Sequence, residues 1–206
     1  MDLSEEYRER MVEEQIAARG ITDGRVVRAF KMVPRHLFVP EVDLATAYAD
    51  SPLSIGSGQT ISQPFIVAKT CELAGLNGTE KVLEIGTGSG YAAAVLSLMT
   101  EAVYTVERLE GLYIRAKNIL QEQGYESVNC VHGDGYKGYE PEAPYDAILL
   151  SAAPKEIPDE LLRQLKVGGR MVGPIGAGEQ YLLRIVRTET GYDQSTHGAV
   201  RFVPMR

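Results

Sequence analysis

Residues Lys81–Tyr91 read KVLEIGTGSGY, and this stretch determines which fold the chain can adopt. The apolar and β-favouring residues of Lys81–Ile85 predict a short buried strand. Glycines then alternate with other residues through Gly86–Gly90, where they allow positive φ and a close approach to a ligand. The alanine-rich run Ala92–Met99 can continue as a helix. A strand, a tight glycine turn and a helix form the nucleotide-binding corner of a doubly wound α/β fold.

The spacing around this turn indicates which nucleotide fits. Glu107 ends the apolar run Val103–Val106 and lies about 20 residues beyond Gly86, where an acid can hold both ribose hydroxyls. A dinucleotide site needs G-x-G-x-x-G with a small third residue, and here that position is Tyr91, which argues against NAD or FAD. The E-x-G-x-G-x-G form that begins at Glu84 resembles motif I of the S-adenosylmethionine-dependent methyltransferases. The alternative is a glycine turn that only lets helix and strand pack.

Composition narrows the class of protein. A chain of 206 residues predicts one domain with a sizeable core, and 44% hydrophobic with 24% charged residues is an ordinary globular balance. The net charge of −7 disfavours non-specific binding to nucleic acid or to an anionic membrane. The N-terminus is charged, and no apolar run reaches the roughly 18 residues of a membrane span. We therefore expect a cytoplasmic protein.

Cysteine and histidine usage predicts neither a disulfide nor a metal site. Cys71 and Cys130 both lie in apolar surroundings and are expected to be buried thiols of a reducing compartment, not a disulfide. The three histidines, His36, His132 and His197, are scattered along the chain. We therefore expect no metal site.

The N-terminal third is predicted to be helical and partly irregular. Ser4 can cap a first helix that ends at Gly20, and Thr22 or Asp23 can start a second that Pro34 stops. An irregular stretch spans residues 40–58. A third helix is expected from Pro64, a residue favoured at the first helical position, to about Ala74.

From Lys81 onward strands and helices alternate. Strands are expected at Lys81–Ile85, Val103–Val106, Val128–Val131, Ala147–Leu150, Arg170–Gly173, Tyr181–Thr188 and Ala199–Val203, and helices at Tyr91–Met99, Glu110–Gln123 and Pro158–Leu165. This order predicts an α/β fold with a doubly wound, mostly parallel sheet, an antiparallel strand at its end and an N-terminal helical extension. Ligands of such sheets bind at the carboxyl ends of the strands, near the switch point.

Three motifs lie at predicted strand ends. In His132–Gly135 (HGDG) the Asp134 carboxylate can accept a hydrogen bond from an adenine amino group, although taken alone an Asp-Gly turn is the better interpretation. Tyr145–Pro154 ends in small residues that leave backbone groups within reach of a ligand, and a buried central strand explains it about equally well. We interpret Leu165–Val172 as structural, a helix end and a turn into the next strand.

The segment Ser54–Pro64 (SIGSGQTISQP) is a polar, glycine-bearing loop that enters a helix. Ser62 stands just before that helix, so it can be an N-cap worth about 1 kcal/mol. A helix N-terminus also carries free N–H groups and partial positive charge. With the hydroxyls of Thr60 and Ser62 it can hold a carboxylate.

Six segments together resemble the protein-L-isoaspartate O-methyltransferase family. They are SIGSGQTISQP, VLEIGTGSGY, YTVE, HGDG, YDAILLSAAP and LKVGGRMVGPIG, while MVEEQIAARGI and VPRHLFVPE are similar to its bacterial and archaeal branch. The resemblance covers nearly the whole chain. It implies a Rossmann-like methyltransferase fold in a single domain, residues 1–206. Residues 1–79 are expected to form a helical N-terminal cover with the substrate loop, and residues 80–206 the nucleotide-binding core.

The resemblance also implies a site. S-adenosylmethionine is expected as methyl donor, leaving S-adenosylhomocysteine, and the acceptor is the free α-carboxylate of L-isoaspartyl residues in peptides and unfolded protein segments. Ser62 is expected as the catalytic residue. Donor-binding residues are expected at Thr60, Ile61, Glu84, Gly86, Thr87, Gly88, Glu107, Arg108, Gly133, Asp134 and Gly135, and substrate-binding residues at Thr60, Ser62, Ala152, Ala153 and Val203. A monomer that binds neither nucleic acid nor membrane is expected.

The chemistry agrees with the residues present. A peptide carboxylate is ionised at pH 7 and needs no base, so the protein must supply mainly in-line placement. Ser62 would orient the acceptor and not abstract a proton. Two alternatives remain: a methyltransferase for another small carboxylate or for an RNA base, and a non-catalytic nucleotide-binding module.

Overall fold

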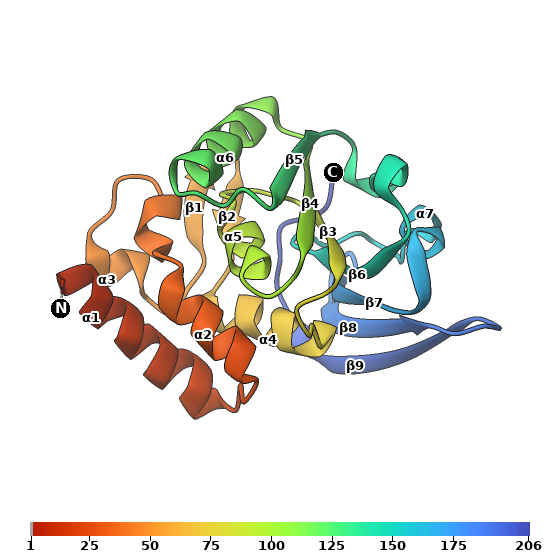
Figure 1. The fold of residues 1–206 in the computed structure, drawn as a ribbon, viewed down its shortest axis with the longest axis horizontal. Helices are drawn as coiled ribbons and strands as arrows, with labels where there is room; N and C mark the ends of the chain where they lie inside the picture. The colour runs from red at the N-terminus through yellow and green to blue at the C-terminus, as the bar shows by residue number, and fades with distance from the viewer. Residues whose placement is uncertain (1) are drawn as a thin grey trace.

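A seven-stranded sheet with strand order β5-β4-β3-β6-β7-β8-β9 forms the centre of the computed structural model, which describes residues 2–206 (Figure 1). The chain enters the sheet at β3 (Lys81–Ile85), moves outward to β4 (Ala102–Glu107) and β5 (Val128–His132), and returns to the other side of β3 with β6 (Tyr145–Leu150). These strands are parallel. The return between β3 and β6 is the switch point of a doubly wound sheet, which confirms the predicted fold class.

The far end of the sheet is antiparallel. β7 (Leu165–Ile175) is parallel to β6, whereas β8 (Gln180–Arg187) and β9 (Tyr192–Val200) each run antiparallel to the preceding strand. The sequence predicts an antiparallel end, and the structure has two antiparallel pairings there.

The register of the central strands brings their carboxyl ends to one edge. Ile85, the last residue of β3, pairs with Val106 on one side and with Leu150 on the other. Side chains alternate between the two faces: Val82 joins one hydrophobic core and Leu83 joins the other. The glycine turn and the residues after β4 and β6 therefore start side by side.

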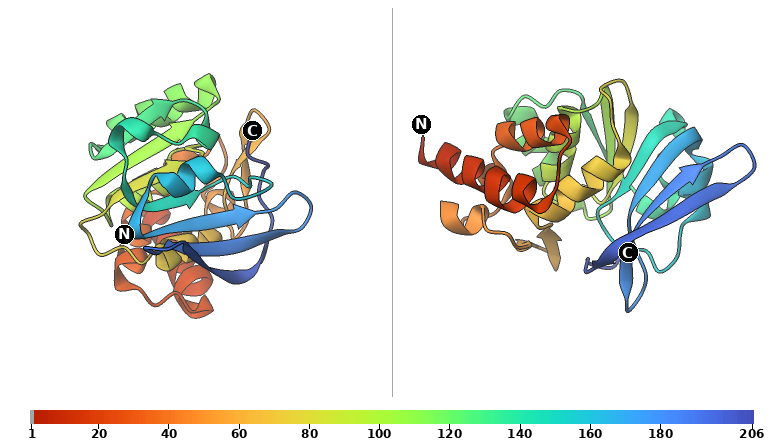
Figure 2. Two further views of the ribbon diagram at one scale, coloured as in Figure 1. Left: turned by 90° about the vertical axis from the view of Figure 1, so that its right-hand side faces the viewer. Right: turned by 90° about the horizontal axis from the view of Figure 1, so that it is seen from below.

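The two faces are covered unequally (Figure 2). Helices α4 (Pro64–Ala74), α5 (Tyr91–Ser97) and α6 (Glu110–Glu122) contribute to the larger core. The smaller core on the opposite face is closed by the short helix α7 (Asp159–Arg163) and by two 3-10 turns, Gly135–Lys137 and Glu140–Glu142.

The N-terminal segment packs into the larger core with the sheet. Helix α1 (Leu3–Arg10) continues through a π-helical turn, Met11–Ile16, and a 3-10 turn, Ala17–Arg19, and ends at Gly20 with φ of 92°, as predicted. The predicted cap at Ser4 is wrong. Asp2 precedes the helix as its N-cap, and the Ser4 hydroxyl donates to the Asp2 carboxylate (2.8 Å).

The second helix follows the predicted boundaries. α2 (Gly24–Met32) is capped by Asp23, whose carboxylate accepts from the Arg25 amide (2.8 Å). The chain leaves the helix at Val33, because the following Pro34 is incompatible with continuing it. A 3-10 turn, Arg35–Phe38, follows.

The stretch predicted to be irregular contains regular structure. Helix α3 (Leu44–Ala47) is followed by a hairpin of β1 (Leu53–Gly56) and β2 (Gln59–Ile61). Ser57 and Gly58 turn the chain with φ of 55° and 69°. The strands are too short for the hydrophobic alternation that reveals longer strands.

Two boundaries near the C-terminus also differ from prediction. The last strand is Tyr192–Val200, not Ala199–Val203, because it is an exposed edge strand whose polar residues show no apolar alternation. The predicted helix end and turn at Leu165–Val172 belong to β7. The register shifts there, because Leu165 pairs with Tyr145 while Arg170 pairs with Ala147.

No helix between residues 2 and 206 combines the length and the apolar character that crossing a bilayer requires.

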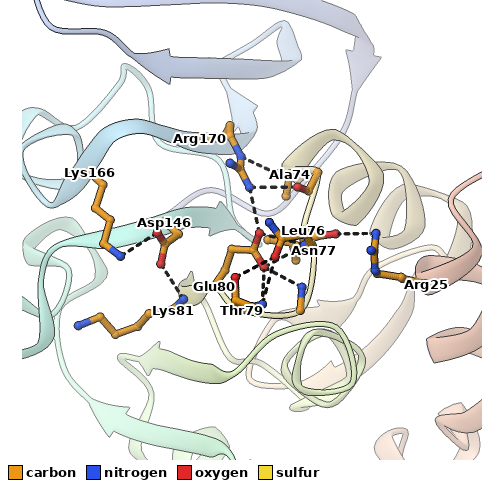
Figure 3. Close-up of polar contacts among 12 residues, drawn as sticks. Arg25, Ala74, Leu76, Asn77, Thr79, Glu80, Lys81, Asp146, Lys166 and Arg170 are labelled. Atoms are coloured by element: carbon orange, nitrogen blue, oxygen red, sulfur yellow. Dashed lines mark hydrogen bonds and ion pairs between the residues drawn. The ribbon is translucent and has the colours of Figure 1, made fainter.

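A buried carboxylate organises the amino-terminal edge of the sheet (Figure 3). Glu80 directly precedes β3 and is only 4% exposed. Its oxygens accept hydrogen bonds from three successive backbone amides at 2.9–3.2 Å, those of Asn77, Gly78 and Thr79. The loop between α4 and β3 is therefore wrapped around one side chain.

Arg170 of β7 connects this loop to helix α4. Its guanidinium lies 3.7 Å from the Glu80 carboxylate and donates to the carbonyl oxygens of Ala74 (2.7 Å) and Gly75 (3.1 Å). Helix C-termini leave carbonyls unpaired, so Arg170 satisfies two of them. Asp146 of β6 accepts from the Lys81 amide (2.9 Å) beside it.

Glu80→Ala is expected to lower the free energy of unfolding by about 2 kcal/mol, because it removes charge-assisted bonds to three amides and the partner of Arg170. Urea unfolding at pH 7 measures the change. The exposed Glu101 on the neighbouring turn provides the matched control, and Glu101→Ala should alter stability by less than about 0.5 kcal/mol. Equal effects of the two substitutions would contradict this role for Glu80.

Candidate active site

A pocket lies at the carboxyl ends of β3, β4 and β6, where the chain reverses direction across the sheet. Its walls combine the glycine turn, the acidic strand ends, the hairpin residues Gln59–Ser62 and a C-terminal segment, Phe202–Val203. Four parts of the chain that are distant in sequence thus meet at the predicted edge.

The glycine turn adopts the conformation that its composition predicts. Gly86, Gly88 and Gly90 have φ of 93°, 55° and 88°, values that favour glycine. A Cβ on Gly90 would stand 3.2–3.4 Å from Leu120 and Ala116. Gly90 therefore permits close packing of the turn against helix α6, the role that the third glycine serves elsewhere.

Glu107 is held rigidly at the end of β4. One carboxylate oxygen accepts from the Gly88 amide (2.9 Å) and the other from the Leu109 amide (2.9 Å). The side chain is buried at 7% exposure. Each carboxylate oxygen has further lone-pair capacity, so Glu107 can still accept bonds from a diol in the pocket.

Glu84 is the second acid of the pocket and is almost fully buried. It accepts from the hydroxyls of Thr105 (2.7 Å) and Ser151 (3.0 Å), and the Thr105 hydroxyl also meets that of Thr87 (2.7 Å). Burial raises the pKa of Glu84 to about 7, against the hydrogen bonds that lower it; the nearby Glu107 raises it slightly.

The charged side chains that line the pocket are acidic. Its ionisable groups include Glu84 and Glu107, but among the described residues that line this pocket there is no lysine or arginine. Two buried carboxylates without a cation suit a positively charged ligand and disfavour a pyrophosphate. The residues present therefore fit a sulfonium donor better than a dinucleotide.

The hairpin delivers hydroxyl groups to the pocket. Thr60 and Ser62 line it, and Ser62 is half-buried. The N-cap of α4 is Gln63, with Pro64 in the first turn, so the capping interpretation of Ser62 is wrong. Its hydroxyl is left to face a ligand.

The C-terminal segment closes the opposite wall. Ala153 donates from its amide to the Val203 carbonyl (2.9 Å) and accepts from the Met205 amide (2.8 Å). This parallel bridge places Phe202 and Val203 in the lining beside Ala152. Ala153 itself is buried behind that wall.

The predicted site residues divide into three groups. Ten share the pocket: Thr60, Ile61, Ser62, Glu84, Gly86, Thr87, Gly88, Glu107, Ala152 and Val203. Two line a cleft that adjoins it through Gly86 and Glu107, namely Arg108 and Gly135. Three line neither: Gly133, Asp134 and Ala153.

Asp134 has a structural contact. Its carboxylate accepts from the Tyr136 amide (3.0 Å) and caps the turn Gly135–Lys137, as the Asp-Gly turn interpretation predicts. Its contact with an adenine remains a prediction. A Cβ on the adjoining Gly135 would lie 2.6 Å from Ile85, so this glycine allows the turn to close against β3.

Sequence reasoning missed several lining residues. Ser89, Tyr91 and Ser151 lie in or beside motifs already identified, and their position at strand ends could have indicated them. Phe202 carried no local signal, because only the bridge to Ala153 brings it to the pocket. In the described chain, no group of three or more metal-ligating side chains gathers.

Comparisons with known proteins agree with one another. The model of the Protein-L-isoaspartate(D-aspartate) O-methyltransferase family matches residues 6–206. A curated protein-L-isoaspartate O-methyltransferase from Geobacter metallireducens is 51% identical over 185 residues, which cover 89% of this chain and 86% of the relative.

Solved structures share the fold. A protein-L-isoaspartate O-methyltransferase superposes with a TM-score of 0.89 at 31% identity, over 96% of this chain and 65% of that one, so this chain spans just under two thirds of its length. A Plasmodium falciparum protein, solved in complex with S-adenosyl-L-homocysteine, superposes with a TM-score of 0.85 at 24% identity, over 97% and 98%.

The buried Glu84 predicts how stability changes with pH. Because its pKa is raised from 4.5 to about 7 by folding, its contribution to stability is complete below 4.5 and is lost as pH rises through about 7. Glu84→Gln keeps the shape and removes the charge. Relative to this variant, the native protein should lose about 3 kcal/mol of unfolding free energy between about pH 4.5 and pH 8. Urea unfolding across that range tests this, and a constant difference would contradict it.

Proposed function

The chain belongs to the protein-L-isoaspartate(D-aspartate) O-methyltransferase family, and we propose that the pocket at the switch point carries out that family's reaction. The enzyme transfers a methyl group from S-adenosylmethionine to the free α-carboxylate of L-isoaspartyl residues in damaged peptides and proteins, which initiates their repair. The observation that carries the proposal is that the glycine turn and the Thr60–Ser62 hairpin line one pocket.

The donor half of the pocket is assigned to the glycine turn and the two acids. Glu107 would accept from the ribose hydroxyls, and Gly86, Thr87 and Gly88 would bring backbone close to the donor. Glu84 would compensate its positive charge. When bound, the donor supplies an electrophilic methyl group on a sulfonium. The Plasmodium falciparum protein of the same fold, solved in complex with S-adenosyl-L-homocysteine, supports this class of donor.

The acceptor half is assigned to the hairpin and the C-terminal segment. Ser62 and Thr60 would donate hydrogen bonds to the substrate carboxylate, and Ala152 and Val203 would border it. Such bonds orient one oxygen toward the methyl and exclude water, and placement of this kind can supply roughly 7–11 kcal/mol of barrier lowering. We keep Ser62 as the catalytic residue, because it would touch the reacting carboxylate.

No proton needs to be removed in this reaction. The substrate carboxylate is ionised at neutral pH. The three histidines have partners outside the pocket: His36 bonds to the Tyr48 hydroxyl (2.8 Å), His132 to the Arg108 carbonyl (3.0 Å) and His197 to the Ser195 hydroxyl (2.9 Å). The methyl ester formed is activated toward attack by a backbone amide, which gives a succinimide that opens partly to normal aspartate.

We extend the proposal to the protein as a whole. Residues 1–206 would act as one domain, and the shared core of the N-terminal helices and the sheet supports this. Its partners would be isoaspartyl peptides and unfolded protein segments. It would act as a cytoplasmic monomer, and the net charge of −7 disfavours binding to nucleic acid or to an anionic membrane.

Transfer of radiolabel from methyl-labelled S-adenosylmethionine tests the function. We expect label in an isoaspartyl peptide and none in the aspartyl peptide of the same sequence, because only the former presents the displaced carboxylate. Label in a small carboxylic acid or in RNA, but not in the peptide, would favour the other methyltransferase reading. Donor binding without transfer to any of these would identify a non-catalytic module.

Ser62→Ala is expected to lower kcat by at least about tenfold, because a hydrogen bond to a charged group is worth about 1.5–3 kcal/mol. Affinity for S-adenosylhomocysteine should change by less than about twofold. Since Ser62 is not the helix cap, unfolding free energy should stay within about 0.5 kcal/mol. Ser57→Ala at the exposed turn of the same hairpin is the control, and equal rates in both variants would remove Ser62 from the site.

A further inference from the structure

Arg35 is a charged side chain in the interior of the protein, at 0% exposure. Arginine is rarely buried unless its donors are paired. Here Nε donates to the carbonyl oxygen of Ala47 (2.9 Å) and Nη2 to that of Ser51 (3.4 Å). The buried guanidinium therefore donates its hydrogen bonds to two backbone carbonyls and not to a carboxylate.

The two carbonyls lie on the segment that leads into the acceptor hairpin. Ala47 ends helix α3, and Ser51 stands two residues before β1 begins at Leu53. The same loop is also joined to the far end of the hairpin segment, because Nε2 of the Gln63 side chain donates to the Asp50 carbonyl (3.2 Å). The base of the hairpin that carries Thr60 and Ser62 is thus held by Arg35.

The other side of the guanidinium faces the donor turn. It lies over the ring of Tyr91, with 5.0 Å from its carbon to the ring centroid. Tyr91 begins helix α5 directly after Gly90, and it lines the pocket. Its ring is fixed edge-on by Phe30 (6.0 Å) and Phe38 (5.8 Å). Aromatic and cation–π contacts of this kind are favourable when desolvated.

The hairpin also touches the donor turn directly. Ile55 of β1 is buried, and its Cδ1 would stand 3.5 Å from a Cβ on Gly88. The hairpin is therefore seated on the turn at Ile55 and joined to the following helix through Arg35 and Tyr91.

We propose that Arg35 is a positioning residue for methyl transfer, which holds the acceptor hairpin and the donor turn at a fixed separation. The inference rests on the proposed function and goes beyond it, because Arg35 lies outside the pocket lining. The reaction needs the acceptor oxygen in line with the methyl group, and a displacement of about 1 Å can cost about 10²-fold in rate. A planar fork that bonds two carbonyls while it lies over an aromatic ring sets that separation, whereas a lysine ammonium cannot reproduce it.

Arg35→Lys and Arg35→Met test the role. Arg28→Met is the matched control, because Arg28 lies on the exposed side of the preceding helix. For each protein we would measure the folded fraction, the Kd of S-adenosylhomocysteine, and kcat and KM with an isoaspartyl peptide. Amide hydrogen exchange in residues 53–61 would report the mobility of the hairpin.

We expect both Arg35 variants to lose at least about fivefold in kcat per folded molecule. The Kd of S-adenosylhomocysteine should stay within about threefold, and exchange in the hairpin should be faster. Two outcomes would overturn the proposal. In the first, the variants lose stability but keep a kcat per folded molecule within about fivefold of the control. In the second, donor affinity falls by the same factor as kcat. If neither variant folds, we would use Ile55→Ala, which loosens the contact of the same hairpin with the donor turn. It should lower kcat in the same way and leave the Kd of S-adenosylhomocysteine within about threefold.

Failure of the two proposals is distinguishable. If the native protein transfers no label to the isoaspartyl peptide, the proposed function fails. If it does transfer label and Arg35→Lys matches Arg28→Met, only the positioning role fails.

Discussion

The parallel pairing of β3 with β4 on one side and with β6 on the other is the constraint on which the site depends. Parallel strands that share a register end at the same edge, and Ile85 faces both Val106 and Leu150 there. The amides of Gly86 and Thr87 then donate to the Val106 carbonyl, and the Gly88 amide meets a carboxylate at the last residue of β4. The bond from Gly88 to Glu107 joins the turn of one strand to the end of its neighbour. Backbone geometry and acid placement are thereby set together.

Electrostatics then selects the ligand. A pocket lined by Glu84 and Glu107 but by no cation within the described chain would hold an anionic cofactor poorly. It suits a donor that carries positive charge. The raised pKa of Glu84, about 7, records the cost of placing a second carboxylate in the interior. The hydroxyls of Thr105 and Ser151 offset part of that cost.

The N-terminal helices and the hairpin complete the site from outside the sheet. Tyr91 explains how they connect to the donor turn. Its size excludes the dinucleotide fingerprint, and in the structure its ring points to Phe30, Phe38 and Arg35, while Gly90 packs on helix α6. Tyr91, the residue that identifies the donor class in the sequence, therefore also connects the nucleotide-binding turn to the N-terminal helices.

The sequence by itself determined the strand–turn–helix corner, the succession of strands and helices from β3 to β8, and most of the predicted donor-site residues that line the pocket. Those features follow from local periodicity, glycine spacing and the rule that carboxyl ends of parallel strands meet. Only the tertiary structure decided that Ser62 lines the pocket while Gln63 takes the N-cap position of α4, that Phe202 reaches the lining through the bridge of Ala153 with Pro204, and that Arg35 is buried. β9 escaped prediction for a related reason, since its exposed residues are held by backbone bonds to β8. Pairing between distant segments runs through backbone groups that every residue carries, so it leaves no pattern of side chains along the chain.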